Sequence, residues 1–258
     1  MTELEFHFHT GVEFSAPVSG HTFALHCLPV EDDAQKLQSY AVRIEPAAEY
    51  GLHRDGFGGW LVCGSCREPH TVFCYDSHGI VRVDGRAQAE PVNPVLKQFT
   101  PLTAMTPELE TLWQSLSLDG KTPQEQATLL NKAAAAALHY VPGLTGNSTT
   151  AGQAFALGSG VCQDYAHILL ALARRSGFAA RYCMGLVPGE GATHAWAELA
   201  LPDGWHGYDP TFACEAGEEH LRFAVGRDAA DCRAERGIFR GAAEQTLHTE
   251  MRLDVRKG

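Results

Sequence analysis

The passage from a glycine-rich turn into a helix at Cys162 is the feature that most restricts how this chain can fold. Gly158 and Gly160 precede the cysteine, and apolar side chains then recur at helical spacing, at Val161, Tyr165, Ile168 and Leu172. The first turn of a helix has unpaired backbone N–H groups and the positive end of the helix dipole, which favour a thiolate. The pattern therefore predicts a reactive cysteine, whereas the alternative is a small apolar residue of the core.

A β-hairpin is predicted further along the chain, around the strong turn signal Pro202-Asp203-Gly204. A turn centred on Pro202 and Asp203 pairs His194 with Thr211. Asp209 then lies two residues from Thr211 on the same face of the hairpin. His194 and Asp209 become diagonal neighbours, close enough for their side chains to meet.

Cys162, His194 and Asp209 together have the composition of a catalytic triad. In such a triad a thiolate attacks, an imidazole carries the proton, and a carboxylate orients the imidazole. Each residue alone is a weak indication. The three together, each in a suitable local context, predict nucleophilic catalysis.

With these motifs in place, the chain resembles the bacterial transglutaminase-like family of papain-related cysteine enzymes. The motifs that carry the resemblance are Gly160-Val161-Cys162-Gln163-Asp164-Tyr165-Ala166-His167, His194-Ala195-Trp196-Ala197-Glu198 and Tyr208-Asp209-Pro210-Thr211. Further matching stretches are 54–58, 68–70, 148–151, 225–228 with Asp231, and Arg236-Gly237. The family usually has an aromatic residue where this chain has Ala229.

The resemblance implies acyl transfer or hydrolysis at an amide or peptide bond through a thioester on Cys162. His194 would move the proton, Asp209 would fix the imidazole, and the backbone N–H of Cys162 would help to hold the oxyanion. No metal or organic cofactor is required, and a protein or peptide substrate is expected. Trp196 and Tyr165 are candidates for substrate contact.

Two other functions stay open from the sequence. One is a cysteine peptidase or amidase in which water alone resolves the thioester. The other is a non-catalytic binding protein on the same scaffold, in which the amino-terminal β region holds a partner. An intact triad argues against the second.

Composition limits the partners of the chain. Its 258 residues carry a formal net charge of -11, which disfavours binding to nucleic acid or to an anionic membrane. No apolar run approaches the roughly 18 residues of a membrane helix, and residues 1–5 lack the pattern of a signal peptide. We therefore expect a cytoplasmic protein whose 8 cysteines are thiols, and a homo-oligomer is compatible with the sequence.

The expected fold class is α+β, with a β-sandwich-like antiparallel module over residues 1–97 and a papain-like catalytic domain over residues 98–258. Strand candidates are 4–9, 21–28, 71–75, 80–83 and, at the end of the chain, 247–255. Helices are predicted to begin at Pro107, at the capping box of Thr122 and Glu125, and after Thr149 or Thr150. In the second domain, helices are expected to pack on an antiparallel sheet.

Several other polar residues are predicted to be structural. Cys63, Cys66, His70 and Cys74 resemble a compact zinc site, but their spacing is tight and their flanks read as strands. His7 and His9 are expected at the surface, Asp164 at the helix start, and His167 and His206 in supporting positions.

Overall fold

The first strand, β1 (Thr2–Leu25), organises the amino-terminal half of the protein. The computed structural model describes residues 1–85 and 91–256. Along its first half β1 pairs antiparallel with β5 (His70–Val83) and with β15 (Gln245–Arg256). Along its second half it pairs with β4 (Trp60–Cys66) and β14 (Glu235–Arg240). The sheet is completed by β2 (Gln35–Glu45), β3 (Glu49–Arg54) and β9 (Gly189–Gly191).

The strands of this sheet are longer than the sequence predicted. Residues 4–9 and 21–28 were expected as separate strands, but 4–9 and most of 21–28 belong to β1, and 71–75 and 80–83 are both parts of β5. The intervening Pro17 lies where the pairing of β1 with β5 shifts register between Glu13 and Val18. A local irregularity accommodates a proline without ending a strand, which explains the error.

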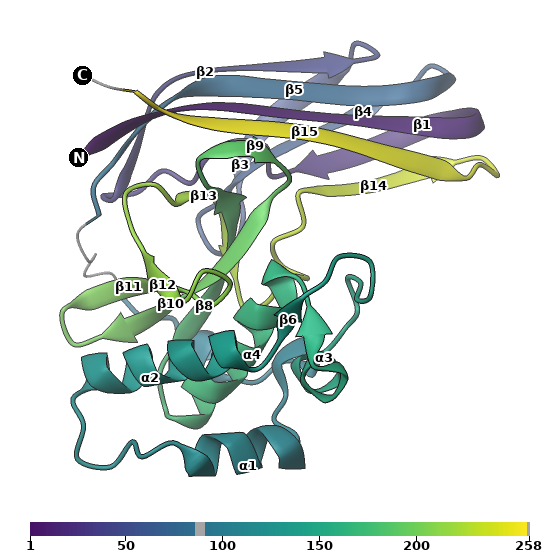
Figure 1. Ribbon diagram of the computed structural model, residues 1–258. Coiled ribbons are helices and arrows are strands. Elements are labelled where there is room, and N and C mark those ends of the chain that lie inside the picture. The colour runs from purple at the N-terminus through teal and green to yellow at the C-terminus, as the bar shows by residue number, and fades with distance from the viewer. Residues whose placement is uncertain (86–90, 257–258) are drawn as a thin grey trace.

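The end of the chain returns to the amino-terminal sheet (Figure 1). The final strand was predicted correctly as an element, and β15 runs alongside β1 from Phe14 to Glu3. The sheet thus takes in strands from both sides of residue 97. The division of the chain at that residue stays a prediction.

Three helices begin at the positions that their capping residues predicted. The helices are η1 (Pro94–Lys97), η2 (Pro101–Thr103), α1 (Pro107–Ser115), α2 (Pro123–Ala136), α3 (Ala151–Leu157) and α4 (Cys162–Arg175). The hydroxyls of Thr106, Thr122 and Thr150 each accept a backbone N–H at the start of α1, α2 and α3. Such caps satisfy N–H groups that have no partner inside the helix.

A second antiparallel sheet supports the helices. Its strands are β8 (Ala180–Leu186), β10 (His194–Leu201), β11 (Gly204–Asp209), β12 (Cys214–Ala216) and β13 (Leu221–Gly226), in the order β12-β11-β10-β8-β13. The helix α4 packs on β10 and β8, and α2 lies against α4 (Figure 1). The short strands β6 (His139–Tyr140) and β7 (Ser159–Gly160) pair beside the start of α4. The α+β class is confirmed.

Aromatic side chains join the two sheets into one core. Phe223 of β13 packs against Phe6 and Phe8 of β1, with ring centroids 5.4 and 5.3 Å apart. All three side chains are buried. The sheet that carries β10 and β11 is therefore held directly against the amino-terminal sheet.

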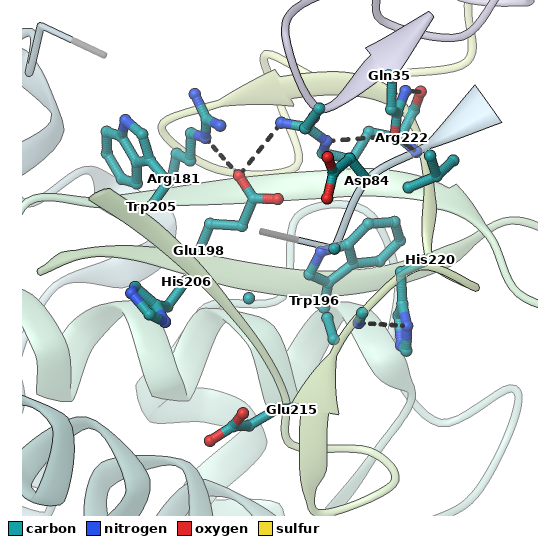
Figure 2. Close-up of a pocket in the computed structure, with 16 residues that line it drawn as sticks. Gln35, Asp84, Arg181, Trp196, Glu198, Trp205, His206, Glu215, His220 and Arg222 are labelled. Carbon is teal, nitrogen blue, oxygen red and sulfur yellow. Dashed lines mark hydrogen bonds and ion pairs between the residues drawn. The ribbon is translucent and has the colours of Figure 1, made fainter. Parts of the chain in front are cut away.

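A buried ion-pair network also connects the two halves (Figure 2). Glu198 Oε2 lies 2.6 Å from Arg181 Nε and 3.5 Å from Arg222 Nη1. Arg222 Nη2 in turn lies 2.8 Å from Oδ2 of Asp32, in the amino-terminal half. Burial raises the pKa of Glu198, but the charges of Arg181 and Arg222 outweigh it and hold that pKa below its usual value.

The cysteines are distributed over both sheets, α4 and two loops. All eight are free thiols, and Cys63, Cys66 and Cys74 lie in β4 and β5, as their flanking strands predicted. Among residues 1–85 and 91–256, no helix is long and apolar enough to cross a membrane.

Candidate active site

Cys162 is the first residue of α4, as predicted. The preceding residue, Val161, has no side-chain group that could cap the helix. Asp164 supplies the cap instead, because its Oδ2 accepts the Val161 N–H at 2.8 Å and the Thr145 hydroxyl at 2.6 Å. Asp164 therefore has the structural role predicted for it, and it fixes the turn that presents Cys162.

The hairpin of β10 and β11 has the predicted register. Leu201 pairs with Gly204, and Ala197 pairs with Tyr208, across the turn. This register brings His194 Nε2 to 2.7 Å from Asp209 Oδ2. The diagonal neighbours inferred from the sequence are therefore in hydrogen-bond contact.

Asp209 is fully buried, and its carboxylate has four donors. Oδ1 accepts the backbone N–H groups of Thr211 and Phe212, and Oδ2 faces the imidazoles of His194 and His220. Burial raises the pKa of Asp209, but the hydrogen bonds and charges of the two histidines outweigh it and hold that pKa well below its usual range. Asp209 is therefore a carboxylate at any ordinary pH.

His194 connects this carboxylate with the cysteine. Burial lowers the pKa of His194, but its contacts with Asp209 and Cys162 outweigh that effect and raise the pKa to about 9. Because Nε2 faces Asp209, Nδ1 is the ring nitrogen left for the Cys162 sulfur. Phe212 stacks on the imidazole with ring centroids 5.0 Å apart and shields it from solvent. His194 is thus an imidazolium at neutral pH, held between two acidic groups.

His220 is a member of the site that the sequence did not predict. Its Nδ1 accepts the Gly217 N–H at 3.2 Å, so that in the neutral ring Nε2 carries the hydrogen. Nε2 lies 3.2 Å from Asp209 Oδ2 and donates to it. His220 precedes β13, which reaches the hairpin only through sheet pairing with β8. No local pattern in the sequence signals this contact.

Of the other predicted residues, Trp196 stacks beside the His194 ring, with ring centroids 6.2 Å apart. Trp196 and Tyr165 are both buried, and the Tyr165 hydroxyl donates to the Leu138 carbonyl. Substrate contact by these two residues stays a prediction. His167 is fully buried and accepts the Ala229 N–H, while His206 pairs with Asp203.

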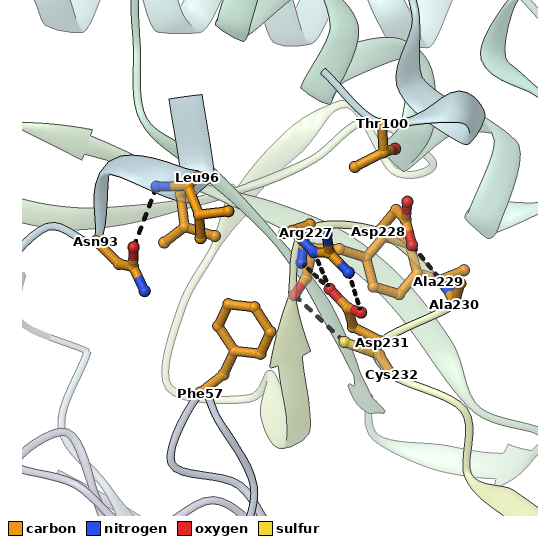
Figure 3. Close-up of polar contacts among 12 residues, drawn as sticks. Phe57, Asn93, Leu96, Thr100, Arg227, Asp228, Ala229, Ala230, Asp231 and Cys232 are labelled. Atoms are coloured by element: carbon orange, nitrogen blue, oxygen red, sulfur yellow. Dashed lines mark hydrogen bonds and ion pairs between the residues drawn. The ribbon is translucent and has the colours of Figure 1, made fainter. Parts of the chain in front are cut away.

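The loop after β13 is held by its own acidic residues (Figure 3). Arg227 Nε lies 2.8 Å from Asp231 Oδ2, and Asp228 Oδ1 accepts the Ala230 N–H at 2.8 Å. Ala229, which stands where the resembling family has an aromatic residue, donates its N–H to His167 under this loop. The segment thereby connects α4, which carries Cys162, with the start of β14.

A cavity of about 180 Å³ opens at the cysteine. Cys162, His194 and Tyr140 line one part of it, and residues 186–193 with Met251, Arg252 and Leu253 line the rest. Arg252 and Met251 belong to β15, so the amino-terminal sheet forms one wall. The site can therefore admit a ligand from solvent to the sulfur.

One potential metal cluster involves the same residues. Within the ranges that the structure describes, Asp209, Cys214 and His220 have ligand atoms that lie within 4.8 Å of one another. The Asp209 oxygen that faces His220 is already engaged by His194. A cation there would compete with the His194 contact, so we assign these residues to the histidine–carboxylate pair and not to a metal centre.

Comparison with known proteins extends the similarity over most of the chain. The model of the transglutaminase-like superfamily matches residues 110–210, which include Cys162, His194 and Asp209. The model of the bacterial transglutaminase-like N-terminal region matches residues 4–82. Together the two matches cover well over half of the chain.

Relatives and solved structures agree with these matches. An uncharacterized protein of Mycobacterium leprae is 27% identical over 262 residues, covering 92% of this chain and 93% of its own. An uncharacterized protein of Mycobacterium tuberculosis is 27% identical over 259 residues, covering 86% and 82%. The crystal structure of a proposed cysteine protease from Cytophaga hutchinsonii has a TM-score of 0.80 at 19% identity, covering 100% of this chain and 91% of that one. At that identity the structural likeness shows a shared fold.

Proposed function

Because the chain belongs to the transglutaminase-like superfamily, we propose that it is a cysteine acyltransferase or hydrolase that acts on amide bonds through a thioester. The superfamily and the shared fold support a cysteine-based catalytic scaffold. The observation that carries the proposal is the placement of His194 between Asp209 and Cys162, with its pKa raised to about 9 by these two neighbours. A histidine in that setting keeps a thiolate as its partner.

In the first half of the proposed reaction, the Cys162 thiolate attacks the carbonyl carbon of an amide. A C–S bond forms, and the carbonyl electron pair moves to oxygen, where the backbone N–H at the start of α4 stabilises it. The tetrahedral intermediate collapses as the C–N bond breaks. The His194 imidazolium gives its proton to the leaving amine, and a thioester on Cys162 remains.

In the second half, an acceptor resolves the thioester. Water or an amine gives a proton to neutral His194 as it attacks the thioester carbon, and the C–S bond breaks. The thiolate and the imidazolium are then restored together. Asp209, held by four donors, keeps the His194 ring in the orientation that both proton transfers need.

We expect iodoacetamide at pH 6 to label Cys162 ahead of all other cysteines. Burial raises the pKa of each of the other seven thiols. That of Cys27 rises to about 12. The other six raised thiols are Cys63, Cys66, Cys74, Cys183, Cys214 and Cys232. Cys162 instead lies beside an imidazolium, which stabilises its thiolate. Peptide mapping by mass spectrometry measures the order of labelling.

The His194→Gln variant is the matched control for this labelling. His194 with its raised pKa is protonated below about pH 9, so the stabilisation of the thiolate is present there and is lost as pH rises through that value. Labelling of Cys162 should therefore slow by about tenfold or more at pH 6 in the variant, with the two rates converging near pH 9. Preferential labelling of the exposed Cys214 at pH 6 would remove Cys162 as the nucleophile.

His220 is proposed as a positioning residue, and we expect His220→Phe to lower kcat by about tenfold to a hundredfold with little change in KM. A hydrogen bond to a charged group contributes about 1.5–3 kcal/mol, and phenylalanine removes that bond while keeping a ring against Trp196.

The pH–rate profile should change as well. With one donor fewer on Asp209, more of its negative charge acts on His194, so the alkaline limb of the profile should move to higher pH. His220→Gln, which can still donate, should restore both values. An unmoved pH profile in His220→Phe would reduce His220 to a packing role.

A further inference from the structure

Three histidines and one aspartate form a cluster on the amino-terminal sheet, away from the catalytic residues. His7 and His9 belong to β1, and Asp76 and His78 belong to β5, the strand that pairs with it (Figure 1). In this register His7 lies opposite His78, and His9 lies opposite Asp76. Side chains two residues apart on a strand point to the same face, and Phe8 between the first two histidines is buried. The four polar side chains, here called the histidine cluster, therefore share the face of the sheet that points to solvent.

The three imidazoles of the histidine cluster converge on the carboxylate of Asp76. His7 Nε2 lies 2.5 Å and His9 Nδ1 lies 3.6 Å from Asp76 Oδ2. His78 Nδ1 lies 3.2 Å from the other oxygen, Oδ1. Burial raises the pKa of Asp76, but the hydrogen bonds of His7 and His78 outweigh it and hold that pKa below its usual value. Asp76 is therefore a carboxylate that faces three ring nitrogens.

A stabilising role explains the histidine cluster poorly. Ion pairs between exposed side chains contribute little to stability, and a histidine carries its charge only when it is protonated. The side chains of His7, His9 and His78 are 49%, 37% and 61% exposed, so that a ligand can reach each ring from solvent. Neutral imidazole is the commonest metal ligand in proteins, and Zn²⁺ accepts carboxylate oxygen beside it.

We propose that His7, His9 and Asp76 bind a divalent transition-metal ion of the zinc type, with His78 holding the carboxylate. Two imidazoles and one carboxylate form a donor set that Zn²⁺ accepts, with water at the fourth position. His78 donates from Nδ1 to Asp76 Oδ1, which leaves Oδ2 for the ion. Hydrogen-bonded partners orient metal ligands in this way. The inference is independent of the proposed acyl-transfer function.

The spacing of the donors suits one ion once a histidine ring has turned. Ligands at about 2.0–2.1 Å from a tetrahedral zinc ion lie about 3.3 Å from one another. The separation of His9 from Asp76 is near that value, and the separation of His7 from Asp76 is shorter. Both ring nitrogens now face the carboxylate and not a common point, so the His7 ring has to turn to admit the ion. Its half-exposed position leaves room for that rotation.

The charges around the histidine cluster favour a cation. The chain has a formal net charge of -11, and Glu250 on β15 adds a carboxylate at the edge of the cluster. Arg43 on β2 and Arg252 on β15 border the cluster from either side. Each arginine is paired with a carboxylate of its own strand, Glu45 and Asp254 respectively. Because these partners offset the two positive charges, the arginines oppose a metal ion only weakly.

The binding test is isothermal titration of Zn²⁺ into the full chain carrying Cys162→Ala and Cys214→Ser, which remove the sulfur ligands in and beside the triad. At slightly alkaline pH, where imidazoles are neutral, we expect one equivalent to bind. His7→Gln and His9→Gln should each weaken binding by about tenfold or more, because each removes a ligand. His53→Gln, a matched substitution of an exposed histidine on β3, should leave binding unchanged.

Two further measurements test the chemistry of the site. A large excess of Mg²⁺ should not displace Zn²⁺, because Mg²⁺ prefers oxygen ligands to imidazole. His78→Leu should weaken binding of Zn²⁺ by about tenfold, because Asp76 loses the donor that orients it. His78→Gln can still donate and should restore the binding.

Three results would each overturn the site. They are no binding of Zn²⁺, unaltered binding in both His7→Gln and His9→Gln, and an equal loss in His53→Gln. A stoichiometry of one ion per two chains, with a dimer in size-exclusion chromatography, would also overturn it, because the ion would then bridge two copies. If His7→Gln does not fold, as judged by its near-ultraviolet circular dichroism, His9→Gln provides the same comparison. No turnover is measured, so a failure of the thioester mechanism leaves these outcomes intact.

Discussion

Replacing Cys162 by alanine is expected to abolish turnover while leaving the fold intact. The loss should reach about a thousandfold or more, because without the sulfur no thioester can form. His194→Ala should cause a loss of the same order, since the thiolate then lacks both its counter-ion and its proton donor. Cys162 lies at the first turn of α4 and lines a cavity, so its replacement removes little packing. Hydrolysis of p-nitrophenyl acetate measures turnover, and thermal unfolding measures the fold.

Asp209→Asn tests the carboxylate that orients His194 in the same group of three residues. Turnover should fall less completely than in Cys162→Ala, because the sulfur and the imidazole remain. Combining Asp209→Asn with Cys162→Ala should add nothing further, since residues that act as one unit are not additive. Near-full activity in His194→Ala, together with unfolding in Asp209→Asn, would make the hairpin merely structural.

Replacing Glu198 by alanine is expected to destabilise the protein by about 3–5 kcal/mol, because two buried guanidinium groups lose a shared carboxylate. Arg181 also stacks over Trp205, with its guanidinium carbon 4.3 Å from the ring centroid, and Arg222 keeps Asp32. The contact with Asp32 leaves the Arg222 guanidinium one ionic partner in the variant. Urea denaturation monitored by circular dichroism gives the free energy of unfolding.

Glu215→Ala is the matched control for this network. Glu215 lines the pocket that Glu198, Arg181 and Arg222 also line, but it is exposed, so its loss should change stability by no more than about 0.5 kcal/mol (Figure 2). Glu198→Gln keeps a hydrogen-bond acceptor and should fall between the two. A loss of under 1 kcal/mol in Glu198→Ala, on the order of an exposed pair, would show that the buried charges are solvated.

The local features of the catalytic core could be predicted because short-range chemistry determines them. The threonine caps of α1, α2 and α3 are set by residues within one helical turn. The register of the hairpin is set by its turn, and from that register the contact of His194 with Asp209 follows. The position of Cys162 at a helix start likewise follows from the glycines before it and the apolar spacing after it.

The features that were missed depend on contacts between distant parts of the chain. Pro17 and the glycines of β1 read as breaks, yet pairing of β1 before and after Pro17 keeps the strand continuous. His220 reaches Asp209 only after β13 joins β8. The ring of donors around Asp209 is thus a product of sheet assembly. Periodicity and motif spacing do not encode such contacts.

The arrangement also suggests why the amino-terminal sheet accompanies the catalytic core. Its strand β15 provides Met251 and Arg252 to the wall of the cavity at Cys162. We infer that the sheet shapes substrate access as well as packing against the core. This inference accords with the shared Phe6, Phe8 and Phe223 cluster, which fixes the two sheets relative to each other.

The most direct test of the thioester mechanism is intact-protein and peptide mass spectrometry after rapid quenching with p-nitrophenyl acetate at pH 6. We predict one acetyl group per chain, located on Cys162, that forms within the first turnover and is absent from Cys162→Ala. Formation should slow in His194→Gln, because the imidazolium that stabilises the thiolate is gone. Acetylation confined to other residues, such as the exposed Cys214, or turnover that persists in Cys162→Ala, would contradict the account.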